Sequence, residues 1–183
     1  LGTGDKLVRF DYKKVKRNTK APNVFIKGVK INNENISWHT LNRTRKKENP
    51  KAAWQKNIAP YVVDELNVFG RTLGESERDS MVQKFSDVRF DDIRPFNAIP
   101  ENLVLPYALN NISFDFVGIE TAKPFMVQYQ FMLEGFEKHW NPVTGKTSVD
   151  YSNLSAGSYS FKLRARSPDG IWSEPIAYGF KVL

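Results

Sequence analysis

The sequence predicts a mainly β protein: an immunoglobulin- or fibronectin-III-like antiparallel β-sandwich with a small, partly helical insertion. Segments 127–133 and 159–165 alternate apolar and polar residues, the pattern of strands with one face in a core and the other in water. From Leu103 onward, about six or seven short strands separated by turns occupy about 80 residues, a density typical of such sandwiches.

Length and composition fit a globular domain and exclude several kinds of chemistry. The 183 residues suit a large single domain, or one of about 100 residues with an extension. Absence of cysteine excludes disulfides and thiolate catalysis. The charge excess, 27 − 20 = +7, is interpreted mainly as a solvated surface. Because the sequence begins and stops within strand patterns, we expect an excised piece of a longer protein.

The first third of the chain predicts isolated strands joined by polar segments. A short strand at Leu7–Phe10 has no partner nearby in sequence, and the basic segment 13–20 is expected to be an exposed linker. Asn23–Asn32 predicts a strand with apolar residues on both faces, followed by a turn and a short strand around Ile36–Trp38. Leu41–Pro60 is polar and basic, which predicts a loop.

The pattern of apolar residues changes from strand-like to helical over residues 59–90. This predicts a helical insertion that packs on the edge or end of the sandwich. Apolar residues recur at helical spacing here, and Ser76 is the expected N-cap of a helix, with Asp79 in the weak capping-box position. Strands are expected again in four later segments of the chain: 88–94, 103–106, 112–119 and 176–182.

The residue types that usually carry catalysis are scattered in this sequence. His39 and His139 each lack a partner at ligand or triad spacing, and we interpret both as surface residues. Asp91 and Asp92 are adjacent in a predicted strand, so their side chains point to opposite faces. No nucleotide, nucleophile-elbow or metalloprotease motif occurs. We therefore predict no catalytic residue, no cofactor and no bound metal.

Basic residues and tryptophans are the remaining binding candidates. The clusters at 13–20 and 43–47 lack aromatic residues, so solvated loops are favoured over nucleic-acid contacts. A stripe of Lys162, Arg164 and Arg166 on one strand face is either solvated or part of an interface, and the first is favoured. Sandwich modules often bind sugars on exposed tryptophans. Trp54, in a polar loop, is the predicted ligand contact, whereas Trp140 and Trp172 are expected to pack at the sandwich ends.

The segments Y-Q-F-M-L-E-G-F-E-K-H-W and Y-S-N-L-S-A-G-S-Y-S-F-K-L-R-A-R-S-P-D-G-I-W closely resemble the three-Y (Y_Y_Y) domain of bacterial two-component sensors. The resemblance covers 103–183 strongly and 1–33 moderately, whereas 41–98 departs from the family pattern. The three tyrosines and the other signature positions, which we interpret as structural, are Tyr129, Gly135, Trp140, Tyr151, Leu154, Gly157, Tyr159, Gly170 and Trp172.

The resemblance implies a domain organisation and a function. Residues 1–22 would be the end of a preceding β-propeller and a linker, and 23–183 the three-Y sandwich with its insertion at about 59–90. Such a domain is extracytoplasmic, here periplasmic, and links a sensory propeller to a transmembrane helix and a cytoplasmic histidine kinase. The implied partners are the chain's own propeller and transmembrane helix, a second copy in a homodimer, and a glycan bound upstream, without nucleic acid.

Two other classes remain open from the sequence: a carbohydrate-binding sandwich module and a passive fibronectin-like spacer. The residues themselves also suggest a role for one signature tyrosine. Tyr159 follows Leu154 and Gly157 as the tyrosine of a tyrosine corner does, with the spacing one residue shorter. We expect its ring to be buried and its hydroxyl to bond a backbone group.

Overall fold

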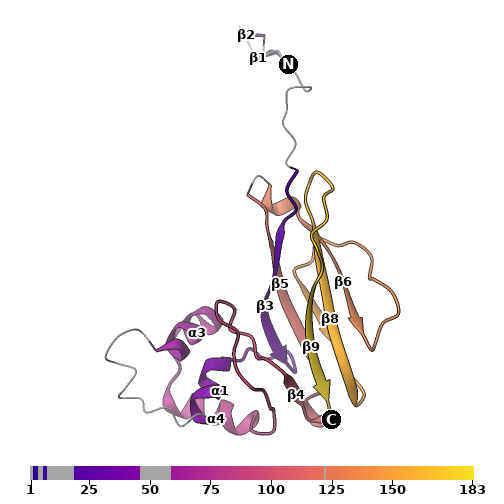
Figure 1. The fold of residues 1–183 in the computed structure, drawn as a ribbon. Helices are drawn as coiled ribbons and strands as arrows, with labels where there is room; N and C mark the ends of the chain where they lie inside the picture. Colours follow the sequence, from indigo (N-terminus) through magenta and orange to yellow (C-terminus); the bar gives the residue numbers. More distant parts are fainter. Residues whose placement is uncertain (1, 4–5, 8–18, 46–58, 122) are drawn as a thin grey trace.

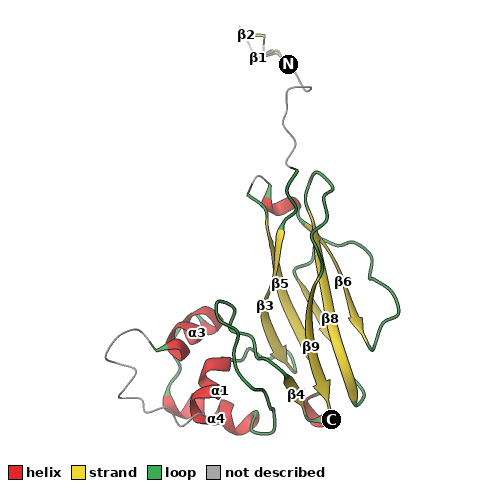
Figure 2. Ribbon diagram, viewed as in Figure 1, coloured by secondary structure: helices red, strands yellow, loops and turns green. Residues whose placement is uncertain are grey.

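Two β-sheets packed face to face form the main body of the protein (Figures 1 and 2). The computed structural model describes residues 2–3, 6–7, 19–45, 59–121 and 123–183. One sheet has the order β3-β5-β7, from β3 (Asn23–Ile31), β5 (Ile112–Ile119) and β7 (Ser148–Tyr151). The other has the order β4-β9-β8-β6, from β4 (Leu103–Leu105), β9 (Ile176–Val182), β8 (Gly157–Arg166) and β6 (Gln128–Glu134). The predicted β-sandwich is confirmed.

Strand pairing is antiparallel throughout the sandwich except at one edge. β4 lies parallel to the last strand β9, with Leu103 opposite Phe180 and Leu105 opposite Val182. The connection from β3 to β4 therefore carries the chain from one sheet to the edge of the other. All of the helical insertion lies within this connection.

The core forms because the alternating strands turn their apolar faces toward each other. Phe114 of β5 and Phe161 of β8 are both fully buried, and their rings stack in parallel with centroids 4.2 Å apart. Tyr178 of β9 meets the Phe114 ring edge-on at 5.8 Å. Full burial of a large aromatic or aliphatic side chain stabilises a fold by about 1.5–3 kcal/mol. These cross-sheet aromatic contacts join the two layers into one body.

A small hairpin precedes the sandwich. Its strands β1 (Gly2–Thr3) and β2 (Lys6–Leu7) pair with each other, with Thr3 opposite Lys6. The prediction that the strand beginning at Leu7 has no partner nearby in sequence is therefore wrong, because Leu7 pairs with Gly2 of β1. The rest of that predicted strand, Val8–Phe10, lies outside the described residues.

Three helices form a unit beside the end of the sandwich at which β9 ends (Figure 1). They are α1 (Trp38–Arg45), α3 (Pro60–Phe69) and α4 (Glu75–Lys84). The predicted helical insertion is present, but it begins earlier than expected. The strand predicted around Ile36–Trp38 is wrong, because Ile36 and Ser37 belong to no strand and α1 begins at Trp38. The start of the loop predicted from Leu41 is also wrong, because α1 continues to Arg45.

Contacts from a distant segment explain the start of α1. The Ser37 hydroxyl caps the helix by accepting the Thr40 N–H at 3.3 Å. The Asp64 carboxylate accepts the neighbouring His39 N–H at 3.0 Å from α3, 25 residues along the chain. Trp38 is buried and donates its indole N–H to the Val29 carbonyl of β3 at 3.1 Å. The helix is thus fixed by tertiary partners.

Two further predictions in the insertion are corrected by the structure. Ser76 is not the N-cap, because α4 already begins at Glu75, and Glu77 instead accepts the Gly74 N–H at 2.8 Å. Glu75 and Glu77 place negative charge in the first turn, where the helix dipole favours it. The strand predicted at 88–94 is reduced to two isolated bridges, Arg89 with Val104 and Ile93 with Pro100.

Candidate functional site

Tyr129, the first signature tyrosine, joins the two sheets near the end at which β3 begins. It lies in β6, and its hydroxyl accepts the N–H of Gly118 in β5 of the opposite sheet at 2.8 Å. Its buried ring meets Phe116 edge-on at 5.2 Å. A side chain at Gly118 would place its Cβ 2.9 Å from a Val127 methyl, so this close approach requires glycine.

Tyr151, the second signature tyrosine, joins the sheets at the opposite end. It lies in β7 and donates its hydroxyl to Glu137 at 3.2 Å, in the turn that follows β6 of the other sheet. Glu137 also accepts the Leu133 N–H at 2.7 Å and the Asn141 side-chain amide at 2.7 Å. Burial, together with the Glu137 charge, raises the pKa of Tyr151 above its ordinary value. The phenol therefore stays protonated as a hydrogen-bond donor.

Tyr159, the third, forms the expected tyrosine corner. Its buried ring stacks on Phe180 with centroids 5.3 Å apart, and its hydroxyl donates to the Ser155 carbonyl at 2.8 Å. Gly135 of the Leu-Glu-Gly-Phe turn packs against the same corner with a φ of 96°. A Cβ there would lie 2.7 Å from the Ser158 carbonyl oxygen. Glycine is needed at this turn for both reasons.

Other signature residues also have structural positions. Leu154 is fully buried, and its N–H donates to the Asn110 carbonyl at 3.2 Å while the Asn110 side chain donates back to the Leu154 carbonyl at 3.1 Å. Gly170 adopts a φ of 89° in the turn between β8 and β9. Gly157 begins β8, and a Cβ there would make only ordinary contact with the Tyr159 ring.

An arginine–tryptophan ladder covers the outer face of the four-stranded sheet. The Arg164 guanidinium lies between two indole rings, 4.7 Å from Trp140 and 4.6 Å from Trp172. Arg166 extends the ladder at 5.4 Å from Trp172. Gln130 accepts hydrogen bonds from Arg164 at 2.6 and 3.1 Å. Cation–π contacts of this kind contribute about 0.5–2 kcal/mol each.

The ladder changes the interpretation of the basic stripe and of the tryptophans. Lys162, the third cation of the stripe, forms an ion pair at 2.9 Å with Glu134 of the neighbouring strand β6. The basic side chains of the stripe therefore have partners on the surface of their own sheet. Trp140 and Trp172 stack on Arg164 on the outer face, so the expectation that they pack at the sandwich ends is wrong. The predicted ligand contact Trp54 lies outside the described residues.

Glu65 is the centre of a buried polar cluster that joins the three helices. Its carboxylate accepts hydrogen bonds from Arg78 of α4 at 2.7 and 2.9 Å, from the Thr40 hydroxyl of α1 at 2.8 Å and from the Leu73 N–H at 2.9 Å. Burial alone raises the pKa of Glu65, but these hydrogen bonds outweigh it and lower the pKa below the ordinary value. The cluster fixes the insertion as a unit.

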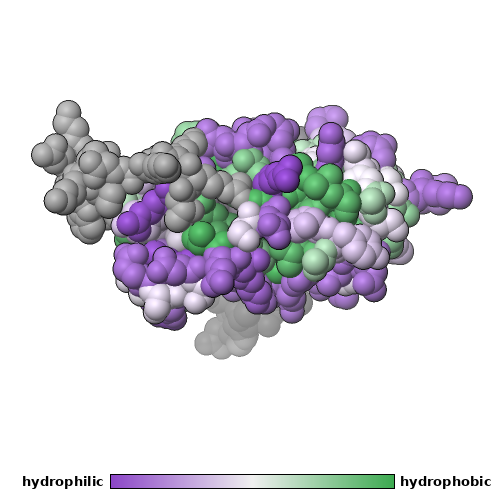
Figure 3. Space-filling model, turned by 90° about the horizontal axis from the view of Figure 1, so that it is seen from below, coloured by the Kyte–Doolittle hydropathy of each residue, from purple (hydrophilic) through white to green (hydrophobic). Residues whose placement is uncertain are grey.

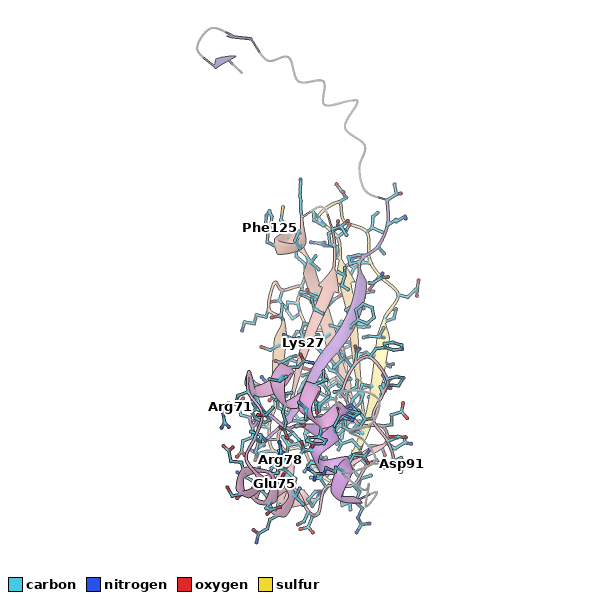
Figure 4. The ribbon with its side chains drawn as sticks, turned by 90° about the vertical axis from the view of Figure 1, so that its left-hand side faces the viewer. Lys27, Arg71, Glu75, Arg78, Asp91 and Phe125 are labelled. Atoms are coloured by element: carbon cyan, nitrogen blue, oxygen red, sulfur yellow. The ribbon has the colours of Figure 1, made fainter. Side chains whose placement is uncertain are left out.

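The neighbouring charges also have structural partners. Arg78 pairs with Glu75 at 2.7 Å as well as with Glu65, and Figure 4 shows Arg78 and Glu75 together in the helical unit. Arg43 of the second predicted basic cluster lies over the Tyr61 ring at 4.7 Å. Burial raises the pKa of Asp64, which caps α1. Most of the first basic cluster lies outside the described residues.

Within the described ranges, the structure contains no metal-binding cluster. No group of three or more His, Asp or Glu side chains there could hold a metal ion. Asp91 accepts a hydrogen bond from Asn102 at 2.7 Å, and Asp92 accepts the Ile93 N–H at 2.9 Å. The two carboxylates therefore make separate local hydrogen bonds, Asp91 to a side chain and Asp92 to the backbone.

The sandwich connects two opposite ends of the molecule. β3 begins at one end, and β9 ends at the other, beside the helical unit (Figure 1). Viewed from the end at which β9 ends, hydrophobic residues gather along the middle of a largely hydrophilic face (Figure 3). None of the described helices is long and apolar enough to cross a membrane.

Comparison with known families supports the resemblance in the sequence. The family model described as the Y_Y_Y domain matches residues 120–183, which contain all three signature tyrosines. These residues comprise β6 to β9 and therefore most of the four-stranded sheet. No curated protein matches the chain.

The chain also matches solved structures of extracellular domains from B. thetaiotaomicron. The extracellular domain of BT4673, described as a one component system, matches 91% of this chain at 20% identity with a TM-score of 0.51. A second structure of BT4673, described as a hybrid two component system, matches 94% at 19% identity with a TM-score of 0.48. The extracellular domain of BT3049, described as a hybrid two component system, matches 52% at 22% identity with a TM-score of 0.40. This chain spans only 14–16% of the length of these proteins.

Proposed function

We propose that this chain is the extracytoplasmic signal-relay domain of a membrane-bound two-component sensor. It couples a sensory β-propeller on the β3 side to a transmembrane helix and a cytoplasmic histidine kinase on the β9 side, through the geometry of a dimer. The Y_Y_Y match and the fold shared with an extracellular domain of a bacterial signalling system support this proposal. The domain itself carries out no reaction and requires no cofactor.

The start of β3 and the end of β9 lie at opposite ends of the sandwich (Figure 1). This is the observation that carries the proposal. A rotation or separation imposed at the start of β3 reaches the end of β9 only if the body between them is rigid. Tyr129 ties the sheets at one end, and Tyr151 ties them at the other, by hydrogen bonds of 2.8 and 3.2 Å. Between them, the stacked aromatic core resists shear because packed interiors have few alternative arrangements.

The edge pairing at the β9 end supports transmission beyond the sandwich. Leu183 donates its N–H to the Leu105 carbonyl of β4 at 2.9 Å, so the chain is still held by the sheet after β9. β4 in turn continues from the helical insertion. A displacement of the sandwich therefore moves the end of β9 and the insertion together. Relay then requires that the dimer populates two geometries and that binding of the signal shifts the balance between them.

A disulfide lock tests the relay in the intact membrane sensor. This chain has no cysteine, so Lys181→Cys, exposed near the end of β9, introduces a unique thiol within it. We expect oxidation to cross-link a dimer and to change kinase autophosphorylation severalfold. Lys27→Cys, on the outer face of β3, is the matched control and should leave autophosphorylation unchanged.

Two results would contradict the proposal. If no cross-link forms at Lys181→Cys in membranes, the dimer geometry is wrong. If the cross-link forms and autophosphorylation does not respond, the β9 end does not transmit the signal. Replacement of residues 23–183 by an unrelated fibronectin-like sandwich separates relay from a passive spacer, since a spacer tolerates this exchange and a relay domain does not.

The sugar-binding alternative rests on exposed indole rings. Trp38 is buried, and the Arg164 guanidinium lies against the rings of Trp140 and Trp172. Trp54 is therefore the tryptophan that tests this alternative. A glycan that binds the chain and loses affinity in Trp54→Ala would favour it over the relay domain.

A further inference from the structure

Exposed apolar side chains gather at the end of the sandwich where β3 begins. Phe125 is 84% exposed and Met126 47% exposed, both on the short 3₁₀ helix η3 (Pro124–Met126) between β5 and β6. Ile119, the last residue of β5, is 53% exposed. On the outer face of the same sheet, Phe25 and Val117 lie directly opposite each other, each 39% exposed. Figure 4 shows Phe125 at this end.

The turn holds Phe125 outward. Pro124 restricts the backbone at its start, and Met126 donates its N–H to the Lys123 carbonyl at 3.0 Å. The next residue, Val127, is buried and anchors the turn in the core. Phe125 therefore cannot collapse onto the sandwich without unwinding this turn. Single exposed apolar residues are ordinary, but an apolar patch on a rigid support marks an interaction surface.

A hollow lies beside the protruding ring. It has a volume of about 540 Å³, and its lining includes Phe125, Met126, Arg166 and Pro168. The surface at this end is therefore uneven, with a projecting aromatic side chain next to a depression. Such a surface fits a folded partner that offers both a pocket and a projection.

We propose that this end docks the domain that precedes β3 in the same chain. The inference rests on the proposed function, in which a sensory domain stands on that side. β3 begins at the same end, with Asn23 opposite Ile119, so a domain joined through the preceding linker is held next to the patch. Tethering gives a high effective concentration, so a modest apolar contact is enough to keep the two domains docked.

A second copy of the chain is a weaker occupant. A second copy has to overcome the cost of association, whereas a covalently joined domain does not. Docking at this end also gives the relay a defined input. The upstream domain would then move the sandwich through the η3 turn as well as through the single covalent connection into β3.

Methionine oxidation tests the docking in the intact extracytoplasmic protein. The chain has three methionines: Met81 is 9% exposed, Met132 is intermediate, and Met126 is 47% exposed. From this structure, hydrogen peroxide should oxidise Met126 before Met132 and Met81. If the upstream domain covers the patch, Met126 is oxidised at least about threefold more slowly than Met132. Mass spectrometry of peptides gives the three rates in one sample.

A variant and its matched control extend this test. Phe125→Asp should undock the domain and raise the Met126 rate above the Met132 rate. Phe96→Asp, at a fully exposed phenylalanine in the segment after α4, should leave all three rates unchanged. A slow Met81 rate in each variant shows that the fold is intact.

Two outcomes would overturn the inference. The first is that Met126 is the fastest methionine to be oxidised in the intact protein, which shows an open patch. The second is that the protection of Met126 disappears on dilution, which assigns the patch to a second copy. Neither outcome decides the relay proposal, because the test of that proposal measures autophosphorylation and not the protection of Met126.

Discussion

At the residue scale, the signature tyrosines act as hydrogen-bonded core residues. Each ring is buried, and each hydroxyl has a specific partner: the Gly118 N–H for Tyr129, the Glu137 carboxylate for Tyr151 and the Ser155 carbonyl for Tyr159. Buried phenols need such partners, because an unpaired hydroxyl costs free energy. The three signature tyrosines therefore have structural roles in the sandwich.

Tyr159→Phe removes the hydroxyl of the tyrosine corner and keeps the ring. We expect the free energy of unfolding to fall by about 1 kcal/mol, because the Ser155 carbonyl loses its donor while the packing on Phe180 remains. Urea denaturation of the two proteins measures the difference. Signalling should survive if the fold does. A variant as stable as the parent but unable to signal would place a functional site at this corner.

Gly135→Ala tests the turn that supports the same corner. Its φ of 96° and the 2.7 Å approach to the Ser158 carbonyl both oppose a side chain. We expect a loss of about 1–3 kcal/mol in the free energy of unfolding. Gly145→Ala is the matched control, since nothing lies within 4 Å of its Cβ position. Equal effects of the two substitutions on thermal unfolding would contradict the strain argument.

At the element scale, long-range polar contacts decide where the helices lie. Glu65 of α3 bonds Thr40 of α1 and Arg78 of α4, so one carboxylate fixes three helices. On the sheet, Arg164 plays a similar part by holding two tryptophans from separate loops against β8. In both cases, one charged side chain contacts partners from more than one segment of the chain.

Glu65→Gln should strongly destabilise the helical unit. Removing one member of a buried ion pair costs about 3–5 kcal/mol, because Arg78 is left without its charge partner. Glu77→Gln is the control: its pair with Arg71 is well exposed and screened by solvent, so we expect a much smaller loss of stability. Chemical denaturation followed by helical circular dichroism measures both. Similar losses in the two variants would show that Glu65 is not the organising residue.

The same pair predicts a pH dependence. The pKa of Glu65 is lower in the folded protein than its ordinary value of 4.5, so its stabilising contribution is complete above that value and is lost as the pH falls through the folded pKa. The stability difference between the parent and Glu65→Gln should therefore narrow on acidification below pH 4.5. A difference that stays constant down to the acid transition would contradict this assignment.

Arg164→Lys tests the ladder on the sheet. Lysine keeps the charge but lacks the planar group that stacks between two rings and bonds Gln130. We expect a loss of about 1–2 kcal/mol and a shift in tryptophan emission toward that of solvated indole. Lys162→Arg, at the exposed pair with Glu134, is the conservative control. Unchanged emission in Arg164→Lys would mean that the rings do not depend on the guanidinium.

At the scale of the whole molecule, the helical unit and the sandwich share a core. Trp38 of α1 bonds the Val29 carbonyl of β3, and its ring meets Phe90 edge-on at 5.5 Å. β4 then carries the chain from the insertion to the edge of β9. The body between the start of β3 and the end of β9 therefore behaves as one unit, as the proposed relay requires.

This continuity predicts a single unfolding transition for the sandwich and the helical unit. Helical circular dichroism and tryptophan fluorescence should give the same midpoint in urea, because Trp38 lies where the two parts meet. Helical signal that disappears at a lower urea concentration than the fluorescence change would show two independent parts. A relay through the insertion would then be excluded.

The sequence by itself determined the sandwich, most of its long strands and the tyrosine corner. Strand alternation and the spacing from Leu154 to Tyr159 are local patterns, and local patterns specify which face is buried and where a turn closes. The helix at Trp38 and the Arg164 ladder were decided only by the tertiary structure. Asp64 caps α1 from 25 residues away, and Trp140 and Trp172 reach Arg164 from separate loops. Such contacts form only after the chain has folded, so no short stretch of sequence encodes them.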